Sequence, residues 1–508
     1  MREKDCSHGD LGMSTFLGRI TQEVDSVRGY SADTLLVSRA MKTILSLLQP
    51  RAVRLILFPW AALFVVLSLA NTQDGGLNAS SRFIAMRAMG EEGTFRIDNR
   101  IGASSDWART PDGHYYSNKA PGPMLLGFPV FILFDQVPRL WEKGFRDEHG
   151  YRHTPGYFTK TWVSFLNQVL PLLILMALIL AWLDRRGSSP AAMVFFAVAT
   201  LFGSTVSMYL NNYSGHGFEA VMQLGALFAL LTGSFAWSGF FAGAALLSDY
   251  GFGVQIPAYV VALALSMRHF RTFWPAILRL ASGAVIPAVL WIWYHSVAFG
   301  GPFAIANHFQ NPDYLDTAHE EKNLWGIFRL PNFEILMELL VRPTRGLLYT
   351  QPWILFFVPV GFFSWFASRG APDRNFARRT ASIFCVLSFI CLLLMNVSYG
   401  GWHGGGAPGP RYMSGIFLCF ALWAALEFDH LHAWVRWAFV ALLGVAVVFR
   451  GMVYGSTILG PTMPLWNWYF EEFFKASKTP LLRVAIYVIL FAVAAIWQKK
   501  LLAKWKLS

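Results

Sequence analysis

Residues 161–183 read TWVSFLNQVLPLLILMALILAWL, and the charged run Asp184-Arg185-Arg186 follows them directly. The stretch contains no charged residue and is slightly longer than the roughly 20 residues that an α-helix needs to cross a bilayer. Basic residues directly after such a segment indicate the cytoplasmic side by the positive-inside rule. The stretch is therefore predicted to be a membrane span that ends in the cytoplasm.

The composition of the whole chain agrees with this interpretation. Of the 508 residues, 55% are hydrophobic and 14% are charged, too few charges to cover the surface of a soluble fold. The net charge is +12, but the basic residues fall mostly in short loops between apolar runs, which argues against nucleic-acid binding. The cysteines form neither a metal-binding pattern nor a disulfide framework; they are Cys6, Cys385, Cys391 and Cys419.

Further apolar runs bring the number of predicted transmembrane helices to about twelve. These runs lie at 55–70, 190–209, 217–234, 238–248, 252–267, 274–298, 347–367, 380–398, 413–428, 435–450 and 481–498. An even number of spans places both termini on one side, and the basic loops identify that side as the cytoplasm. We therefore predict an all-α polytopic membrane protein, with residues 1–50 as a cytoplasmic N-terminal extension and 51–508 as one transmembrane domain.

The opposite face receives the loops that hold most of the non-basic polar residues and the glycine clusters. These loops are 71–160, 211–216, 248–251, 300–345, 400–411 and 451–479. The first, 71–160, is predicted to be a long periplasmic loop with juxtamembrane helices. Ser81–Glu91 has the spacing of an amphipathic helix on the membrane surface. Residues 121–136 are bounded by proline and, as a helix, would reach about 24 Å, short of a core about 30 Å thick.

Two loops on this face hold residue types that could carry chemistry. The first loop crowds Asp98, Asp106, Asp112, Tyr115, Tyr116 and Lys119 into a short stretch. A carboxylate there could act as a general base, and a lysine beside it could bind a phosphate. A solvated loop with ordinary turn residues explains the same run.

The second of these loops is GGWHGGGAPGPRY at 400–412, where glycines allow close backbone approach and Arg411 is a fixed cation that can bind phosphate. A flexible loop with Arg411 anchored to lipid headgroups is the alternative. His216 in NNYSGHGFEA, Asp249 in a short turn, and Arg345 lie on the same face. Each alone is open to a structural interpretation, because interfacial arginines usually snorkel.

Several segments, in their order along the chain, resemble a family of bacterial membrane enzymes. They are RFIAMRAMGEEGTF (82–95), GHYYSNKAPGP (113–123), LFGSTVSMYLNNYSGHGFEA (201–220), GGPFAIANHF (300–309), RGLLYTQP (345–352) and GGGAPGPRY (404–412). From about residue 50 to the end, the chain resembles the GT-C superfamily of polyprenyl-phosphate-dependent glycosyltransferases. The most similar branch is the dolichyl-phosphate-mannose-protein mannosyltransferase-like group, which includes the lipid A aminoarabinose transferase.

The resemblance also suggests roles for residues of the first loop. In that superfamily the loop carries an acidic catalytic residue before an Arg-aromatic pair, and a lysine in a K-x-P-G-like element. Lys119 matches the lysine, and Arg82-Phe83 matches the pair. Ala79 and Ser80 stand where the acid should be, so Asp74, Asp98 or Asp106 would have to supply the carboxylate.

The resulting hypothesis is a GT-C-like glycosyltransferase of the bacterial inner membrane with its active face in the periplasm. It would transfer a sugar from a polyprenyl-phosphate donor to a glycolipid, glycan or protein acceptor. Membrane lipid is a further expected partner, and nucleic acid is not. Asp106 or Asp98 would be the catalytic base. The substrate-binding residues would be Lys119, Arg411, Arg82, His216, Arg345 and Tyr116.

No cofactor is required by this hypothesis. A divalent metal is compatible with it, although no His/Asp/Glu spacing in the sequence indicates one. One alternative is a transporter or flippase for lipid-linked sugars, whose usual marks, intramembrane charges and repeat symmetry, are not seen in the sequence. Another is an inactive GT-C-like assembly protein, which the missing acid keeps open.

Overall fold

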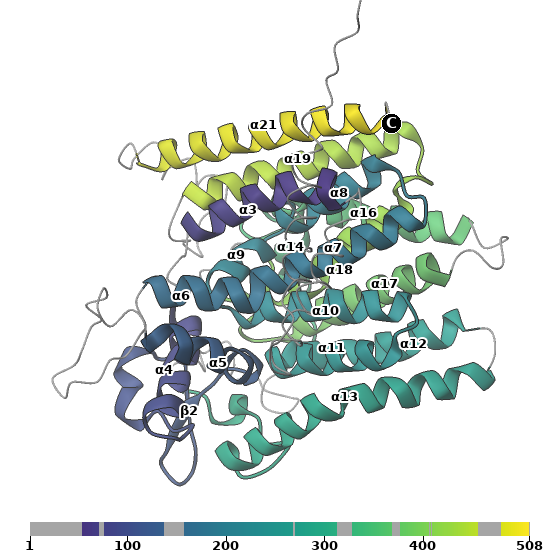
Figure 1. Ribbon diagram of the computed structural model, residues 1–508. Coiled ribbons are helices and arrows are strands. Elements are labelled where there is room, and N and C mark those ends of the chain that lie inside the picture. The colour runs from purple at the N-terminus through teal and green to yellow at the C-terminus, as the bar shows by residue number, and fades with distance from the viewer. Residues whose placement is uncertain are drawn as a thin grey trace, which may run out of the picture.

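The computed structural model describes residues 53–70, 76–136, 157–267, 270–311, 328–367, 376–405, 407, 409–455 and 479–506. These residues form an all-α protein, apart from one two-stranded β-hairpin. Figure 1 shows long helices lying side by side, with α21 (Thr479–Lys506) and α19 (Ala433–Gly455) along one edge and α13 (Phe270–Phe299) along the opposite edge. The predicted N-terminal extension, 1–50, lies outside the described residues.

Helices make up most of the first half of the described chain. These helices are η1 (Val53–Leu57), α3 (Phe58–Ala70), α4 (Gly76–Glu91), η2 (Asp98–Ala103), α5 (Gly122–Gln136), α6 (Tyr157–Ser164), η4 (Phe165–Val169), α7 (Leu170–Arg185), α8 (Pro190–Leu201), α9 (Val206–Asn211), α10 (Gly215–Leu231), α11 (Phe235–Ser248), η5 (Tyr250–Gln255) and α12 (Ile256–Ser266). The hairpin consists of β1 (Trp107–Arg109) and β2 (Tyr115–Ser117).

The second half is helical as well. After α13 it contains η6 (Ala306–Phe309), α14 (Phe333–Leu340), α15 (Leu347–Thr350), α16 (Pro352–Ala367), α17 (Phe376–Ser398), η9 (Arg411–Met413), α18 (Ser414–Phe428), α19 and α21. The core of the array is apolar, and every residue of α18 is buried. Such a helix is hydrophobic on all sides because it has no face toward the aqueous solvent.

The lengths of these helices agree with a membrane protein. Among the described residues, 6 helices are long and apolar enough to cross a membrane, and further apolar helices of 10–17 residues accompany them. The run 161–183 belongs to one continuous helical stretch, α6–η4–α7, which ends at Arg185 as predicted. The protein is thus an all-α membrane protein, while the total of about twelve spans stays a prediction.

The first loop gathers at one end of the helices. Figure 1 shows α4, α5 and β2 together at the left end, whereas the C-terminal end of α21 lies at the right end. The placement of α5 beside the helix ends is the one that a juxtamembrane helix would have. Its exposed side chains are apolar, with Leu133 exposed by 62%, which suits a helix in contact with lipid.

The prediction that Ser81–Glu91 lies on the membrane surface is wrong. The helix forms, as α4, but a continuous run from Ser81 to Ala88 is buried. The spacing of its apolar residues indicated one buried face, yet the two arginines of this helix, Arg82 and Arg87, do not face water either. Both are instead enclosed within the protein, where carboxylates from distant segments lie close to them.

A buried ion pair, which we call the Arg87–Asp135 clasp, joins α4 to α5. The guanidinium of Arg87 is 1% exposed, and its Nη2 lies 2.8 Å from Oδ1 of Asp135. Glu91 extends the network, since it also accepts a hydrogen bond from Arg100 at 2.8 Å. Burying charges is tolerated only when each is paired in this way. The clasp therefore fixes the two helices that flank the hairpin.

Candidate active site

The hairpin of the first loop brings Asp106 and Lys119 together. β1 and β2 are antiparallel, and Trp107 pairs with Ser117. Asp106 directly precedes β1, and Lys119 follows β2 by two residues, so both lie at the open end of the hairpin. Nζ of Lys119 lies 2.9 Å from Oδ2 of Asp106. The geometry thus joins the catalytic and phosphate-binding candidates of the first loop in one ion pair.

Helix α4 holds this end of the hairpin in place. The hydroxyl of Ser81 donates a hydrogen bond of 2.5 Å to the carbonyl oxygen of Asp106. The same hydroxyl lies 2.6 Å from Oγ of Ser117. One buried serine thus contacts the residue before β1 and the last residue of β2. Because Ser81 is fully buried in α4, the backbone beside Asp106 has little freedom to move.

Arg82, the next residue on α4, extends the group toward α10 and α11. It is 3% exposed, and its Nη1 donates to the carbonyl oxygen of Asn78 at 3.0 Å. Burial lowers the pKa of Arg82 to about 10, against the attraction of Asp249 and Asp106, so the side chain remains charged near neutral pH. A Cβ at Gly215 would collide with this guanidinium. Arg82 can occupy this position because residue 215 is a glycine and has no side chain.

Arg411 approaches the group from the glycine-rich segment 400–412. It lies at the start of η9, and its Nη2 donates a hydrogen bond of 3.0 Å to the hydroxyl of Tyr412. Burial lowers the pKa of Lys119, Asp106 opposes this shift, and the positive charges of Arg82 and Arg411 add to it. Three cations thus lie close enough to repel one another, and the carboxylate of Asp106 among them offsets part of this repulsion.

Several buried polar atoms of this group have no hydrogen-bond partner among the residues that the structure describes. They are Nε of Arg82, Oδ1 of Asn118, OH of Tyr209 and Nε of Arg411. Buried polar atoms are nearly always paired in folded proteins, and an unpaired one calls for a specific explanation. The two Nε atoms and the hydroxyl of Tyr209 can donate to a polar anionic ligand beside the three cations, whereas Oδ1 of Asn118 can only accept a hydrogen bond.

Arg345 has a different task in the same region. Its Nη1 donates to the carbonyl oxygen of Ala407 at 2.8 Å, and its Nη2 donates to that of Gly405 at 2.6 Å. The residue is 4% exposed. These contacts hold the glycine-rich segment that precedes Arg411, and the expected role of Arg345 in substrate binding stays a prediction.

Two further candidates, Asp98 and Tyr116, have other partners in and beside the hairpin. The carboxylate of Asp98 accepts a hydrogen bond from the backbone N–H of Tyr115 at 2.6 Å and lies 2.8 Å from Nδ1 of His114. Tyr116 is 4% exposed, and its ring packs against that of Phe299 at 5.5 Å. Both residues stabilise the hairpin and its surroundings. Asp74, the third candidate for the carboxylate, lies outside the described residues.

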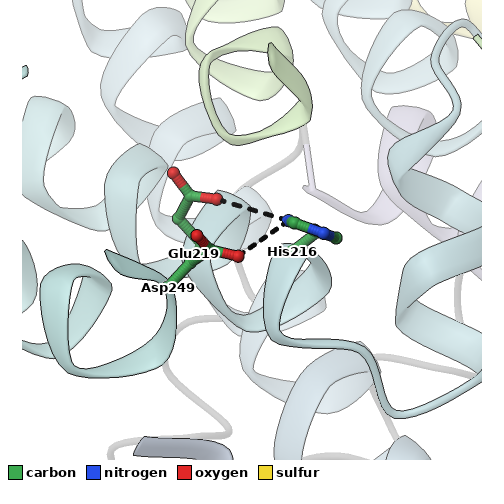
Figure 2. A group of neighbouring side chains, drawn as sticks. All are labelled: His216, Glu219 and Asp249. Carbon is green, nitrogen blue, oxygen red and sulfur yellow. Dashed lines mark ion pairs between the residues drawn. The ribbon is translucent and has the colours of Figure 1, made fainter. Parts of the chain in front are cut away.

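His216 lies beside two carboxylates, one of which the sequence analysis missed. Figure 2 shows His216 and Glu219, both from α10, with Asp249 from the turn between α11 and η5. Nδ1 of His216 is 2.9 Å from Oδ2 of Asp249 and 3.9 Å from Oε2 of Glu219. The His-x-x-Glu spacing places both side chains on one face of a helix. This is the signal that could have identified Glu219 as a partner of His216.

We call His216, Glu219 and Asp249 the trio. Among the described residues, this trio could hold a metal ion, since its ligand atoms all lie within 4.8 Å of one another. Arg82 links it to the Asp106 group, because Arg82 interacts with both Asp249 and Asp106. A Cβ at Gly415 would collide with the carboxylate of Glu219. Gly415, at the start of α18, therefore makes room for the trio.

The geometry defines a helical membrane protein with a charged site at the end of its helices that carries the first loop. No protein-family model matches the chain, and it has no significant match among curated proteins. Its structure is similar to a crystal structure of the Archaeoglobus fulgidus oligosaccharyltransferase in complex with zinc and sulfate, with 16% sequence identity and a TM-score of 0.46. The similarity covers 78% of this chain and 52% of that one, about half of its length. At this TM-score, it establishes neither a shared fold nor a shared activity.

Proposed function

We propose that this chain is a glycosyltransferase of the bacterial inner membrane that uses a polyprenyl-phosphate-linked sugar as its donor. The acceptor would be a glycolipid, glycan or protein at the periplasmic face. The observation that carries the proposal is the gathering of Lys119, Arg82 and Arg411 around Asp106 at one end of the helices. This arrangement suits the transfer. The cations can stabilise the phosphate that leaves the donor, and the carboxylate can take up the proton of the acceptor hydroxyl.

The cations would serve the leaving phosphate. When the bond between the anomeric carbon and the phosphate oxygen breaks, that oxygen keeps the electron pair and its negative charge grows. Fixed positive charges aimed at it stabilise the transition state more than the bound donor. The Nε atoms of Arg82 and Arg411 have no hydrogen-bond partner in the part of the chain that the structure describes, so they are donors suited to this purpose. A guanidinium is suited to the role because its planar fork matches phosphate oxygens.

The carboxylate of Asp106 would accept the proton of the acceptor hydroxyl as its oxygen attacks the anomeric carbon. The ion pair between Asp106 and Lys119 supports Asp106 for this role, because the proposed base would then lie beside a proposed phosphate ligand. The carboxylate of Asp98 already contacts the ring of His114 and accepts a hydrogen bond from the backbone N–H of Tyr115. We therefore assign the base to Asp106 and a structural role in the hairpin to Asp98.

The position of Asp106 also bears on the acid that the GT-C pattern expects at Ala79 or Ser80. Both residues lie in α4, and the neighbouring Ser81 contacts the backbone of Asp106 directly. The backbone of Asp106, from another segment, thus contacts the residue that directly follows the position where the pattern expects an acid, which supports Asp106 as its substitute. This arrangement favours an active transferase over an inactive assembly protein.

Two measurements test the proposal. The purified protein is incubated with synthetic polyprenyl-phosphate hexoses and pentoses and with envelope fractions of a strain that lacks the gene. We expect transfer of the labelled sugar and release of polyprenyl phosphate. Mass spectrometry of the glycolipids and glycans lost on deletion identifies the product. A deletion strain with an unchanged envelope, together with no release of polyprenyl phosphate, would contradict the proposal.

A further inference from the structure

We propose that His216, Glu219 and Asp249 form a binding site for one divalent transition-metal ion, which ties the start of α10 to the turn between α11 and η5. The inference rests on the geometry of these three side chains. It is independent of the transfer reaction, and its test measures metal binding rather than activity.

The distances fit a common metal ion. Imidazole nitrogen and carboxylate oxygen ligands lie about 2.0–2.2 Å from zinc, so two ligands of one ion are about 3–4 Å apart. Nδ1 of His216 lies 2.9 Å from Asp249 and 3.9 Å from Glu219. Every pair of ligand atoms is within 4.8 Å. Small side-chain movements would bring all three into contact with one ion.

Charge and burial give a second, independent reason. The side chain of Glu219 is 3% exposed, and its contacts with Nδ1 of His216, at 3.9 Å, and with Nε2 of Gln255, at 3.5 Å, are long. A buried carboxylate with such weak partners is costly, and a second carboxylate beside it adds to the cost. Arg82 balances one negative charge, that of Asp249. A divalent ion would supply the positive charge that Glu219 lacks.

The surroundings hold the ligands in position. The hydroxyl of Ser214 caps α10 by accepting from the N–H of His216. Oδ1 of Asp249 accepts from the N–H of Gly251 at 2.9 Å, which directs Oδ2 toward His216. Such outer contacts orient ligands and strengthen metal binding. The side chain of Asp249 is 19% exposed, so an ion can enter from that side.

The ligand types select among metals. One imidazole nitrogen and two carboxylate oxygens suit manganese, iron or zinc, whereas calcium prefers a site made of oxygens only. A protonated His216 in a simple ion pair with Asp249 is the rival explanation of the same contact. It predicts no metal, so binding experiments separate the two.

The full-length protein is purified in detergent, treated with EDTA, desalted and titrated with Mn²⁺, with the EPR signal of free Mn²⁺ as the readout. We expect one bound ion per chain, displaced by Zn²⁺ and not by Ca²⁺. Glu219→Gln, which keeps the shape of the side chain, should lower the affinity at least about tenfold, and Asp249→Asn should do the same.

The protein provides a matched control in His114 and Asp98. Their Nδ1 and carboxylate oxygen are 2.8 Å apart, much as in the trio, but they belong to no three-ligand group found among the described residues. Asp98→Asn should therefore leave Mn²⁺ binding unchanged. Failure of the wild type to bind Mn²⁺ and Zn²⁺, or equal binding by Glu219→Gln, would overturn the proposal and leave the transferase hypothesis untouched.

Discussion

Nζ of Lys119 lies 2.9 Å from Oδ2 of Asp106, across the open end of a short antiparallel hairpin. The ion pair joins a proposed phosphate ligand to the proposed base. Asp106 stabilises the charged form of Lys119, whose pKa burial otherwise lowers. Lys119 in turn lies beside the carboxylate that we propose as the base. Substitutions at either residue therefore act on one site.

Removal of a phosphate-site cation should abolish most transfer. We expect Lys119→Ala and Arg411→Ala each to lower the rate of sugar transfer about 10²–10³-fold, the usual effect of losing one transition-state donor. The measurement is release of polyprenyl phosphate by purified variants with normal membrane expression. Arg109→Ala, which removes an exposed cation from the same hairpin, should retain near wild-type rates. If both site variants stay active, the phosphate-site hypothesis is wrong.

The two aspartates of the first loop should differ in effect. Asp106→Asn keeps the size of the side chain but removes the proton acceptor, which should cost about 10²–10⁴-fold in rate. Asp98→Asn weakens the contact with His114 and should have a mild effect on rate. A severe loss in Asp98→Asn with little change in Asp106→Asn, measured in the same assay, would reverse the assignment of the base.

Transfer should fall at alkaline pH because of Lys119. Burial lowers the pKa of this side chain below its ordinary value of 10.5, and only the protonated form can stabilise a leaving phosphate. As the pH rises through that lowered pKa, the charge and the activity are lost together. Lys119→Arg keeps its charge to higher pH, so the alkaline limb of its pH–rate profile should move upward. An unchanged limb in Lys119→Arg would assign the titration to another group.

The Arg87–Asp135 clasp should be important for stability. Asp135→Ala leaves the guanidinium of Arg87 buried without this carboxylate, and breaking a buried pair typically costs about 3–5 kcal/mol. The matched control is Arg342→Ala, because Arg342 is paired with Glu338 but its side chain is 51% exposed. An exposed pair contributes at most about 1 kcal/mol. Thermal unfolding of the purified variants compares the two, and equal shifts would contradict the assignment.

The predicted topology can be tested with single cysteines in a background free of the natural ones. Cysteines at Asp112 and Trp402, both in predicted periplasmic loops, should react with an impermeant thiol reagent in intact spheroplasts. A cysteine at Ser188, next to Arg185 and Arg186, should react only after the membrane is opened. Reaction of Ser188→Cys in intact spheroplasts would place the charged site on the cytoplasmic side.

The sequence predicted the helices well because each apolar run must form a helix to pair its backbone groups away from water. It placed Lys119 beside a carboxylate of the first loop but could not show that this partner is Asp106 rather than Asp98 or Asp74. That partnership depends on the register of two three-residue strands, too short to leave a pattern. The trio of His216 was missed in part because Asp249 comes from another turn of the chain.

The burial of α4 was unpredictable for a related reason. Arginine in a helix ordinarily indicates a water-exposed face, and α4 contains Arg82 and Arg87. Their carboxylate neighbours, Asp249 and Asp135, lie far along the sequence. Spacing within α4 therefore carries no information about them, and only the folded chain shows that both charges are compensated inside.

The clasp between α4 and α5 has a consequence for exchanging parts between related chains. Residues 76–136 run from one clasped helix through the hairpin to the other, so both halves of the ion pair travel together when this block is transplanted whole. A crossover placed between Arg87 and Asp135 would instead separate the two residues and leave one of them buried without its partner. Transplanting α4, the hairpin and α5 together therefore keeps the ion pair intact.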